Sequence, residues 1–306
     1  VALENGNLND VVSIPPEASG VEGSSVWLSP GENHSLKDLL YALMLRSGND
    51  AATAIAIHIG GSVEGFVNMM NNTAKKIGAN NTHFVNPHGL HDDNHYSTAY
   101  DLALIASYAL KNPIFEEIVS TKYYTMPWEG HEWDRTLKNK NKILWTYEGA
   151  NGVKTGFTKK AGRCFVGAAK RNGMQLVAVV LDCGPMFEES TSLMDYGFEH
   201  YSNINIVKQG EFIKSLPVIK GTQDKVDVVA GQEYSVALNN IEQKYIQTRF
   251  IIPDSLEAPV EKGKRIGTLN VYLKNELIRE IPVITSESVK KKTIWDLLDK
   301  MINIWR

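Results

Sequence analysis

The feature of this sequence that most restricts its fold is a pair of β-type runs joined by Asn172-Gly173. Residues 163–171 and 174–182 are rich in small and β-branched apolar residues. An Asn-Gly pair between two such runs is a strong signal for a two-residue β-hairpin. Residues 152–158 form another β-type run just before them, and residues 187–201 follow with helical periodicity. We therefore expect three consecutive antiparallel strands with a helix packed back on the sheet.

Helical signals dominate the first third of the chain. Ser35 with Asp38 and Thr98 with Asp101 have the capping-box spacing, and Asp50 stands where it would cap the next apolar run. The expected helices span residues 36–45, 51–59, 63–77, 99–111 and a short segment from Asn112-Pro113. Helices and strands interleave without βαβ alternation, so we predict an α+β fold, an antiparallel sheet covered by helices.

A possible substrate-binding edge lies at residues 151–158 (NGVKTGFT). Lys154 supplies a positive charge, Thr155 supplies a hydroxyl donor, and Gly156 has no side chain to keep a ligand backbone away. Together they suit an extended peptide that ends in a carboxylate and lies along a sheet edge. The alternative for this triplet alone is an exposed strand end with a solvated lysine.

A second triplet lies upstream, where Ser47-Gly48-Asn49 interrupts two helical runs. An S-x-N triplet followed by K-T-G is the pattern of penicillin-recognising serine enzymes. With these triplets, the chain resembles the D-alanyl-D-alanine carboxypeptidases, the low-molecular-mass penicillin-binding proteins. Residues 43–52 (LMLRSGNDAA) and 82–90 (THFVNPHGL) look like signatures of that family. The resemblance covers most of residues 1–200 and becomes looser after that.

The resemblance implies a serine β-lactamase/transpeptidase-like fold and an activity that removes the terminal D-alanine of peptidoglycan stem peptides through an acyl-enzyme. It implies that Ser47 relays a proton toward the leaving amine, that Asn49 holds the substrate amide, and that Lys154 acts electrostatically. β-Lactams would acylate the same site as substrate mimics. No metal or organic cofactor is implied, and the expected location is extracytoplasmic, on the outer face of the cytoplasmic membrane.

The same resemblance implies roles for three substrate-binding residues. Thr155 would bind the terminal carboxylate, and Gly156 would let the substrate backbone approach. The backbone N–H of Phe157 would supply half of the oxyanion hole, with the other half coming from the nucleophilic serine.

The nucleophile motif of this family, S-x-x-K, is missing where it is expected. No serine in the first half of the chain is followed three residues later by lysine. Residues 1–6 resemble the end of the helix that follows the motif, with Gly6 as its stop. We therefore expect the natural protein to continue upstream, with S-x-x-K in the same helix as Val1. The alternative is a catalytically inactive homologue that binds peptidoglycan or a partner. β-Lactam hydrolysis as the main role is disfavoured, since we find no deacylating glutamate of the family type.

Composition excludes several other classes of function. The net charge is −3 and no basic stripe precedes the C-terminus, which gives no case for nucleic-acid binding. Four histidines in residues 83–95 invite a zinc site, but a hydrogen-bonded loop is favoured because no cysteine lies among them and asparagine, proline and glycine dominate the segment. Cys164 and Cys183 are expected to be reduced core residues. The aromatic-rich segment 121–150 either forms core and hairpin surface or, through Trp145, walls the substrate cleft.

The domain prediction has three parts. Residues 1–203 form the peptidase domain, residues 204–286 a small all-β domain, and residues 287–306 an amphipathic helix. The β-rich runs of the second domain are 212–219, 225–229, 234–238, 245–252, 267–273 and 277–283. The terminal segment places Ile294, Trp295, Leu297, Leu298, Met301, Ile302 and Trp305 on one side, after three lysines. This pattern favours a membrane-surface helix over a helix that docks on the protein itself.

Overall fold

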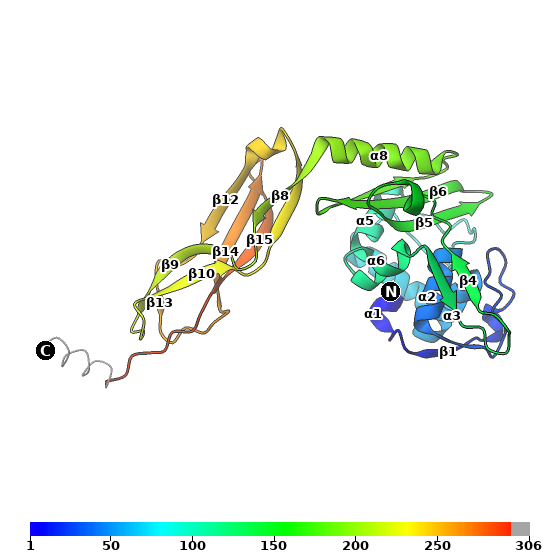
Figure 1. Ribbon diagram of the computed structural model, residues 1–306, viewed down its shortest axis with the longest axis horizontal. Helices are drawn as coiled ribbons and strands as arrows, with labels where there is room; N and C mark the ends of the chain where they lie inside the picture. Colours follow the sequence, from blue (N-terminus) through cyan, green and yellow to red (C-terminus); the bar gives the residue numbers. More distant parts are fainter. Residues whose placement is uncertain (295–306) are drawn as a thin grey trace, which may run out of the picture. The chain divides into compact units, whose positions relative to one another are not determined.

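The computed structural model describes residues 1–294, and it contains the hairpin predicted at Asn172-Gly173 (Figure 1). Strands β6 (Gly162–Arg171) and β7 (Met174–Val180) pair antiparallel, with Arg171 opposite Met174. Asn172 and Gly173 have positive φ angles of 51° and 76°, as a type I′ turn requires. Strand β5 (Ala150–Thr158) pairs with the other side of β6, which gives the sheet order β5-β6-β7. The three predicted antiparallel strands are confirmed.

Helices cover both faces of this sheet. Along β6, Phe165 and Ala169 pack with Met194 of α8 (Met186–His200), which runs along the sheet in Figure 1. Val166 and Ala168, at the alternate positions, pack against apolar residues of α5 (Ala99–Ala109) and α6 (Pro113–Ser120). The two-residue period of the strand therefore produces a helix–sheet–helix arrangement.

The largest core cluster joins most of the remaining helices of this unit. It contains Leu36, Leu39 and Leu45 from one helix and Ile55 from the next. The remaining helices of the first unit are α1 (Ala2–Asn5), α2 (Leu36–Arg46), α3 (Asn49–Gly60), α4 (Val63–Lys76) and α7 (Ile143–Thr146), with the 3₁₀ turn η1 (Pro16–Ala18). Its remaining strands form two pairs, β1 (Val11–Ser13) with β2 (Asn33–Ser35) and β3 (Tyr123–Met126) with β4 (Arg135–Lys138).

The capping predictions have different outcomes. Ser35 and Asp38 form the expected capping box of α2. Thr98 caps α5, but the carboxylate of Asp101 accepts hydrogen bonds from residues 81 and 82 and does not close a box. The prediction that Asp50 caps its helix is wrong. α3 begins at Asn49, and the Asp50 carboxylate turns outward from the helix to a neighbouring loop.

A second unit begins at Glu199, so the division falls between Phe198 and Glu199. The sequence analysis placed it five residues later, because it missed β8, a strand that pairs with β11. The strands are β8 (Tyr201–Val207), β9 (Phe212–Ile219), β10 (Lys225–Ala230), β11 (Tyr234–Asn239), β12 (Ile246–Ile251), β13 (Leu256–Glu257), β14 (Arg265–Leu273) and β15 (Glu276–Thr285), with the 3₁₀ turn η2 (Glu242–Tyr245).

The second unit is all-β over its described residues, as predicted. Its main sheet has the order β12-β14-β15-β10-β9-β13. Val289 and Lys291 form bridges to Val260 and Gly221, so the first residues of the predicted terminal helix segment belong to this β unit. The predicted helix itself lies outside the described residues from 295 on. Among residues 1–294, no helix is long and apolar enough to cross a membrane.

The cysteine prediction is half right. Cys164 and Cys183 are both free, as expected. Both are half-buried, however, whereas core positions were predicted. They lie at the end of the β6–β7 hairpin, where the Cys183 N–H donates to the Arg163 carbonyl.

We predict that Phe165→Ala destabilises the first unit by about 3–5 kcal/mol, the usual cost of truncating a buried aromatic side chain. Phe165 is 1% exposed and makes an edge contact with Phe187. Urea denaturation of the variant measures the loss. Leu193→Ala, at an exposed position of α8, is the control and should cost less than about 1 kcal/mol. Equal losses in the two variants would contradict this description of the core.

Candidate active site

Ser47 lies at the turn that separates α2 from α3. It is the C-cap of α2 and has left-handed backbone angles, φ 61° and ψ 39°. Gly48 follows, and a Cβ there would lie 2.8 Å from Asp50 Oδ1. The turn therefore needs a residue without a side chain at position 48, and a non-glycine residue at positive φ marks Ser47 as a candidate functional residue.

Lys154 reaches Ser47 from the sheet. Its Nζ donates to the Ser47 hydroxyl, 107 residues away in sequence, and to the Thr155 carbonyl at 2.8 Å. Burial lowers the pKa of Lys154 to about 8, and the charge of Lys140 adds to this effect. At neutral pH, Lys154 is therefore mostly protonated and donates hydrogen bonds within the site.

Lys140 is a site residue that the sequence analysis missed. Its Nζ donates to Ser24 Oγ at 3.0 Å, and burial together with the charge of Arg46 lowers its pKa. Two buried asparagines, Asn139 and Asn141, flank it, and the Asn139 side chain donates to the Thr121 carbonyl at 2.9 Å. Buried asparagines on both sides of a lysine within residues 138–141 (KNKN) were the available signal, but burial is not visible in sequence.

These cations create a positive site. In the part of the chain that the structure describes, Arg46, Lys140 and Lys154 form no ion pair with a carboxylate. Partly buried cations without a counter-ion are costly, and an anionic ligand would offset that cost. The arrangement therefore favours a substrate with a carboxylate, as the K-T-G triplet predicts.

Asn49 is fixed by the loop that precedes β2. Its side-chain NH₂ donates to the Glu22 carbonyl at 2.6 Å, and its backbone N–H donates to the Ser24 carbonyl at 2.7 Å. One N–H of the NH₂ group is thus used within the protein, and the side-chain oxygen makes no hydrogen bond within residues 1–294. An oxygen acceptor at this position can receive an N–H from a substrate amide.

The K-T-G residues lie on an open strand edge. β5 is the edge strand of its sheet and pairs only with β6 among the described strands. Thr155 is half-buried, a Cβ at Gly156 would meet no atom within 4 Å, and Phe157 is 69% exposed. The edge has the room and the unpaired backbone groups that an added peptide strand needs.

Beneath the sheet, Lys154 lines a groove of about 930 Å³. The other walls come from α1 and the residue before it, from α2 to α6 and from β5 and β6, and they are almost entirely apolar. Lining residues include Leu43, Met44, Ile55, Phe66, Ile105 and Val153. An apolar groove of this size can accept a helix of the same polypeptide or a large apolar ligand.

Two further sequence predictions concern Trp145 and the histidine-rich loop. Trp145 lies on α7, and its ring is edge-on to Tyr123 with the Lys122 and Lys138 ammonium groups nearby; its place in the wall of the substrate cleft stays a prediction. In the histidine-rich loop, His83 Nδ1 lies 2.7 Å from the Asn94 carbonyl and His95 Nδ1 accepts from the Val85 N–H. Within residues 1–294, no group of three or more candidate ligands is arranged for a metal ion.

The S-x-x-K spacing occurs once outside the first half, at Ser288 and Lys291. These residues lie in the second unit, where Val289 and Lys291 form β bridges. The backbone is therefore extended, so the serine and lysine are not one helical turn apart. Ser288 Oγ accepts from the Lys262 N–H. This pair is structural and does not supply the nucleophile motif.

The helix-covered antiparallel sheet, with an S-G-N turn joined to a K-T-G strand edge, defines the class of penicillin-recognising serine enzymes. Residues 2–184 match the family model for D-alanyl-D-alanine carboxypeptidase, and residues 201–291 match the C-terminal domain of penicillin-binding protein 5. The chain belongs to the D-alanyl-D-alanine carboxypeptidase family.

Individual relatives agree with this assignment. The chain is 32% identical to the D-alanyl-D-alanine carboxypeptidase DacF of Bacillus subtilis, covering 99% of this chain and 79% of the relative. It is 30% identical to DacA of Escherichia coli, covering 93% and 72%. Penicillin-binding protein 5 from Haemophilus influenzae has a similar structure, with a TM-score of 0.71, 29% identity, and coverage of 93% and 84%. A peptidoglycan synthesis regulatory factor from Streptococcus pneumoniae gives a TM-score of 0.75, 28% identity, and coverage of 94% and 88%.

We predict that the pKa of Lys154 rises in Lys140→Met, because the variant removes one of the two causes that lower it. NMR titration of the lysine Cε resonances, assigned with Lys154→Met, should give a value of about 8 in the unmodified chain. Lys142→Met, two residues further along, is the control and should leave that value unchanged. An ordinary lysine pKa at Lys154 in the unmodified chain would refute the buried, positively charged site.

Proposed function

We propose that this chain is the substrate-binding part of a serine-type D-Ala-D-Ala carboxypeptidase that trims the terminal D-alanine of peptidoglycan stem peptides. The observation that carries the proposal is the hydrogen bond between Lys154 and Ser47 at the edge of the apolar groove. The nucleophilic serine and its lysine base would come from an S-x-x-K helix that is not among these 306 residues and that occupies the groove.

The groove supports this position for the missing helix. Its walls are apolar, so an amphipathic or apolar helix gains free energy by filling it. Lys154 both lines the groove and donates a hydrogen bond to Ser47. A helix in the groove would therefore bring its serine and lysine next to the residues that already form the rest of the site.

Each residue of the site would then have its own role in the reaction. The stem peptide adds to the open edge of β5, and its terminal carboxylate meets the Thr155 hydroxyl and the field of Lys154 and Lys140. The helix serine attacks the penultimate D-alanine carbonyl, its proton passing to the lysine base, and forms an ester while the C–N bond breaks. Ser47 delivers a proton to the departing amine, which leaves as D-alanine.

Hydrolysis of the ester would complete the cycle. Water attacks the acyl-enzyme, the ester C–O bond breaks, and the serine recovers its proton. The oxyanion of each tetrahedral intermediate would receive the Phe157 N–H and the N–H of the nucleophile. Asn49 would accept a substrate amide N–H through its free side-chain oxygen. A β-lactam would acylate the same serine because it presents a reactive carbonyl and a carboxylate in the same relation.

The family assignment also suggests where the protein works. Peptidoglycan lies outside the cytoplasmic membrane, so the enzyme would be extracytoplasmic. We propose that residues 293–306 attach it to the membrane surface through their apolar side chains, with the lysines at 290–292 contributing positive charge. A homologue that binds peptidoglycan without catalysis is the competing outcome, and the acylation experiment below distinguishes the two.

In a longer polypeptide that includes the S-x-x-K motif, Thr155→Val should lower kcat/KM on peptides with a free terminal carboxylate by about ten- to hundredfold. This corresponds to the roughly 1.5–3 kcal/mol of a lost hydrogen bond to a charged group. The substitution keeps the shape and removes only the hydroxyl. Thr125→Val on the exposed side of β3 is the matched control. Unchanged kinetics in Thr155→Val would remove this residue from the site.

Acylation by a labelled penicillin tests the proposal as a whole. The 306-residue chain should form no covalent adduct, whereas the polypeptide extended through S-x-x-K should form one at the motif serine. Ser47 should not replace it, since Asp50 stands three residues on where the family needs lysine. Mass spectrometry of the labelled peptide identifies the serine. An adduct on Ser47, or on any serine within residues 1–306, would overturn the assignment, and no adduct in the extended chain would favour the inactive homologue.

A further inference from the structure

Trp27 is held in an unusual position. Its side chain is 78% exposed, and its backbone lies in the left-handed region at φ 63°. A bulky residue at positive φ costs about 1–3 kcal/mol and persists only where the surroundings enforce it. An indole that is both solvent-exposed and conformationally strained has no role in the core. Strain of this kind is a reason to look for function.

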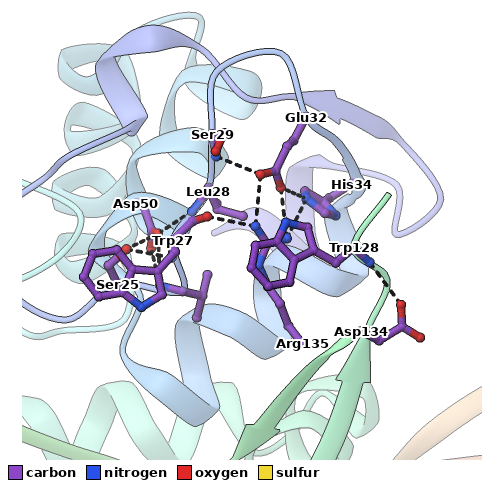
Figure 2. A network of polar contacts seen from close by, with 11 residues as sticks. Ser25, Trp27, Leu28, Ser29, Glu32, His34, Asp50, Trp128, Asp134 and Arg135 are labelled. Atoms are coloured by element: carbon purple, nitrogen blue, oxygen red, sulfur yellow. Dashed lines mark hydrogen bonds and ion pairs between the residues drawn. The ribbon is translucent and has the colours of Figure 1, made fainter. Parts of the chain in front are cut away.

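One set of contacts enforces the conformation from α3. The buried Asp50 carboxylate accepts from Ser25 Oγ at 2.6 Å, from the Val26 N–H at 3.0 Å and from the Leu28 N–H at 3.2 Å (Figure 2). The side chains of Val26 and Leu28 are buried in the main core cluster. With both neighbours anchored inward and their N–H groups tied to one carboxylate, Trp27 is directed outward.

A second set of contacts comes from β4. Arg135 Nη2 donates to the Trp27 carbonyl at 2.8 Å, and its guanidinium pairs with Glu32 at 2.9 Å (Figure 2). Burial acts to raise the pKa of Glu32, but hydrogen bonds from Arg135 and His34 hold it at about 2. Glu32 is thus ionised at any physiological pH, and Arg135 stays fixed on the Trp27 carbonyl.

The loop that carries Trp27 also forms the catalytic site. The Ser24 carbonyl accepts from the Asn49 N–H, and Ser24 Oγ accepts from Lys140. Three residues span at most about 10 Å, so Trp27 lies within that reach of Ser24. The exposed indole is therefore at the border of the candidate site and is rigidly connected to it.

The indole face of Trp27 is free for a ligand. Within residues 1–294, no aromatic ring and no cation is stacked on it. Two other tryptophans differ in this respect, since Trp128 is stacked on His131 with Arg135 over its ring, and Trp145 contacts Tyr123 and two lysines. A flat, exposed and pre-oriented aromatic surface loses little conformational entropy on binding.

We propose that Trp27 is a subsite for a sugar ring of the glycan strand that carries the stem peptide. The proposal rests on the proposed function, which supplies a peptidoglycan substrate. A pyranose ring has an apolar face of C–H groups that matches a flat indole, and its hydroxyls stay in water at the rim. About four residues separate the scissile bond from the sugar, or roughly 13 Å of extended chain. The Trp27 backbone lies within about 10 Å of Ser24, and Ser24 contacts Asn49 and Lys140 of the candidate site.

Two probes test the subsite on the 306-residue chain: a stem pentapeptide and the same pentapeptide on its β-1,4-linked disaccharide of N-acetylated amino sugars. Isothermal titration gives the ratio of the two dissociation constants. We expect the disaccharide to improve binding by about tenfold, the scale of one aromatic contact. In Trp27→Ala this ratio should fall to about one, and in Trp27→Phe most of it should remain. Tyr100→Ala, at a similarly exposed aromatic residue on α5, should retain the full ratio.

A second measurement separates this proposal from the proposed function. The free disaccharide, without any peptide, should shift the Trp27 indole N–H resonance in NMR, assigned with Trp27→Phe. That shift does not depend on the peptide edge or on a nucleophile. A sugar advantage that survives in Trp27→Ala, or an indole resonance unmoved by saturating disaccharide, would overturn the subsite. Failure of the pentapeptide to bind, with the indole shift present, would count against the carboxypeptidase proposal alone.

Discussion

The hydrogen bond from Lys154 to Ser47 joins the two halves of the first unit. Lys154 comes from the edge of an antiparallel sheet, and Ser47 comes from the turn between two helices in the core. Burial and the neighbouring Lys140 make the charged ammonium costly here. The packing of α5 and α6 under the sheet stabilises the fold against the free-energy cost of this buried charge, and a bound carboxylate would lower that cost.

Buried charges elsewhere in the unit serve to position the loop before β2. The Asp50 carboxylate accepts hydrogen bonds from backbone and hydroxyl groups of residues 25–28. Arg135 donates a hydrogen bond to the Trp27 carbonyl of the same loop. The carboxylates of Asp50 and of Glu32, the ion-pair partner of Arg135, both accept hydrogen bonds, so their burial gives a fixed loop without an orphan carboxylate. That loop in turn presents the carbonyls that bind Asn49 and the hydroxyl that binds Lys140. The geometry of the candidate site and the exposed position of Trp27 therefore depend on the same two networks.

Local chemistry in the sequence was sufficient for much of this fold. The Asn-Gly turn and the Ser35 capping box act within a few residues, so they predicted the β6–β7 hairpin and the start of α2. The S-G-N and K-T-G triplets likewise predicted one site for Ser47 and Lys154, and these two residues are hydrogen-bonded. The role of Asp50 was not predictable, because a carboxylate at a helix start is normally a cap, and here the tertiary loop competes for it. Lys140 was missed for a related reason, since its importance arises from burial beside Lys154 and Arg46 and has no local signature. The strand β8 was missed because its partner β11 is about thirty residues away along the chain.

The central claim is that the Lys154–Ser47 pair and the β5 edge form the carboxylate end of an acylation site whose nucleophile sits in the groove. A crystal structure of the extended polypeptide after reaction with benzylpenicillin tests it most directly. The account predicts an S-x-x-K helix in the apolar groove, its serine acylated, and the penicillin carboxylate within hydrogen-bond distance of Thr155 and Lys154. An acylated serine elsewhere, or a bound carboxylate that contacts neither residue, would contradict it.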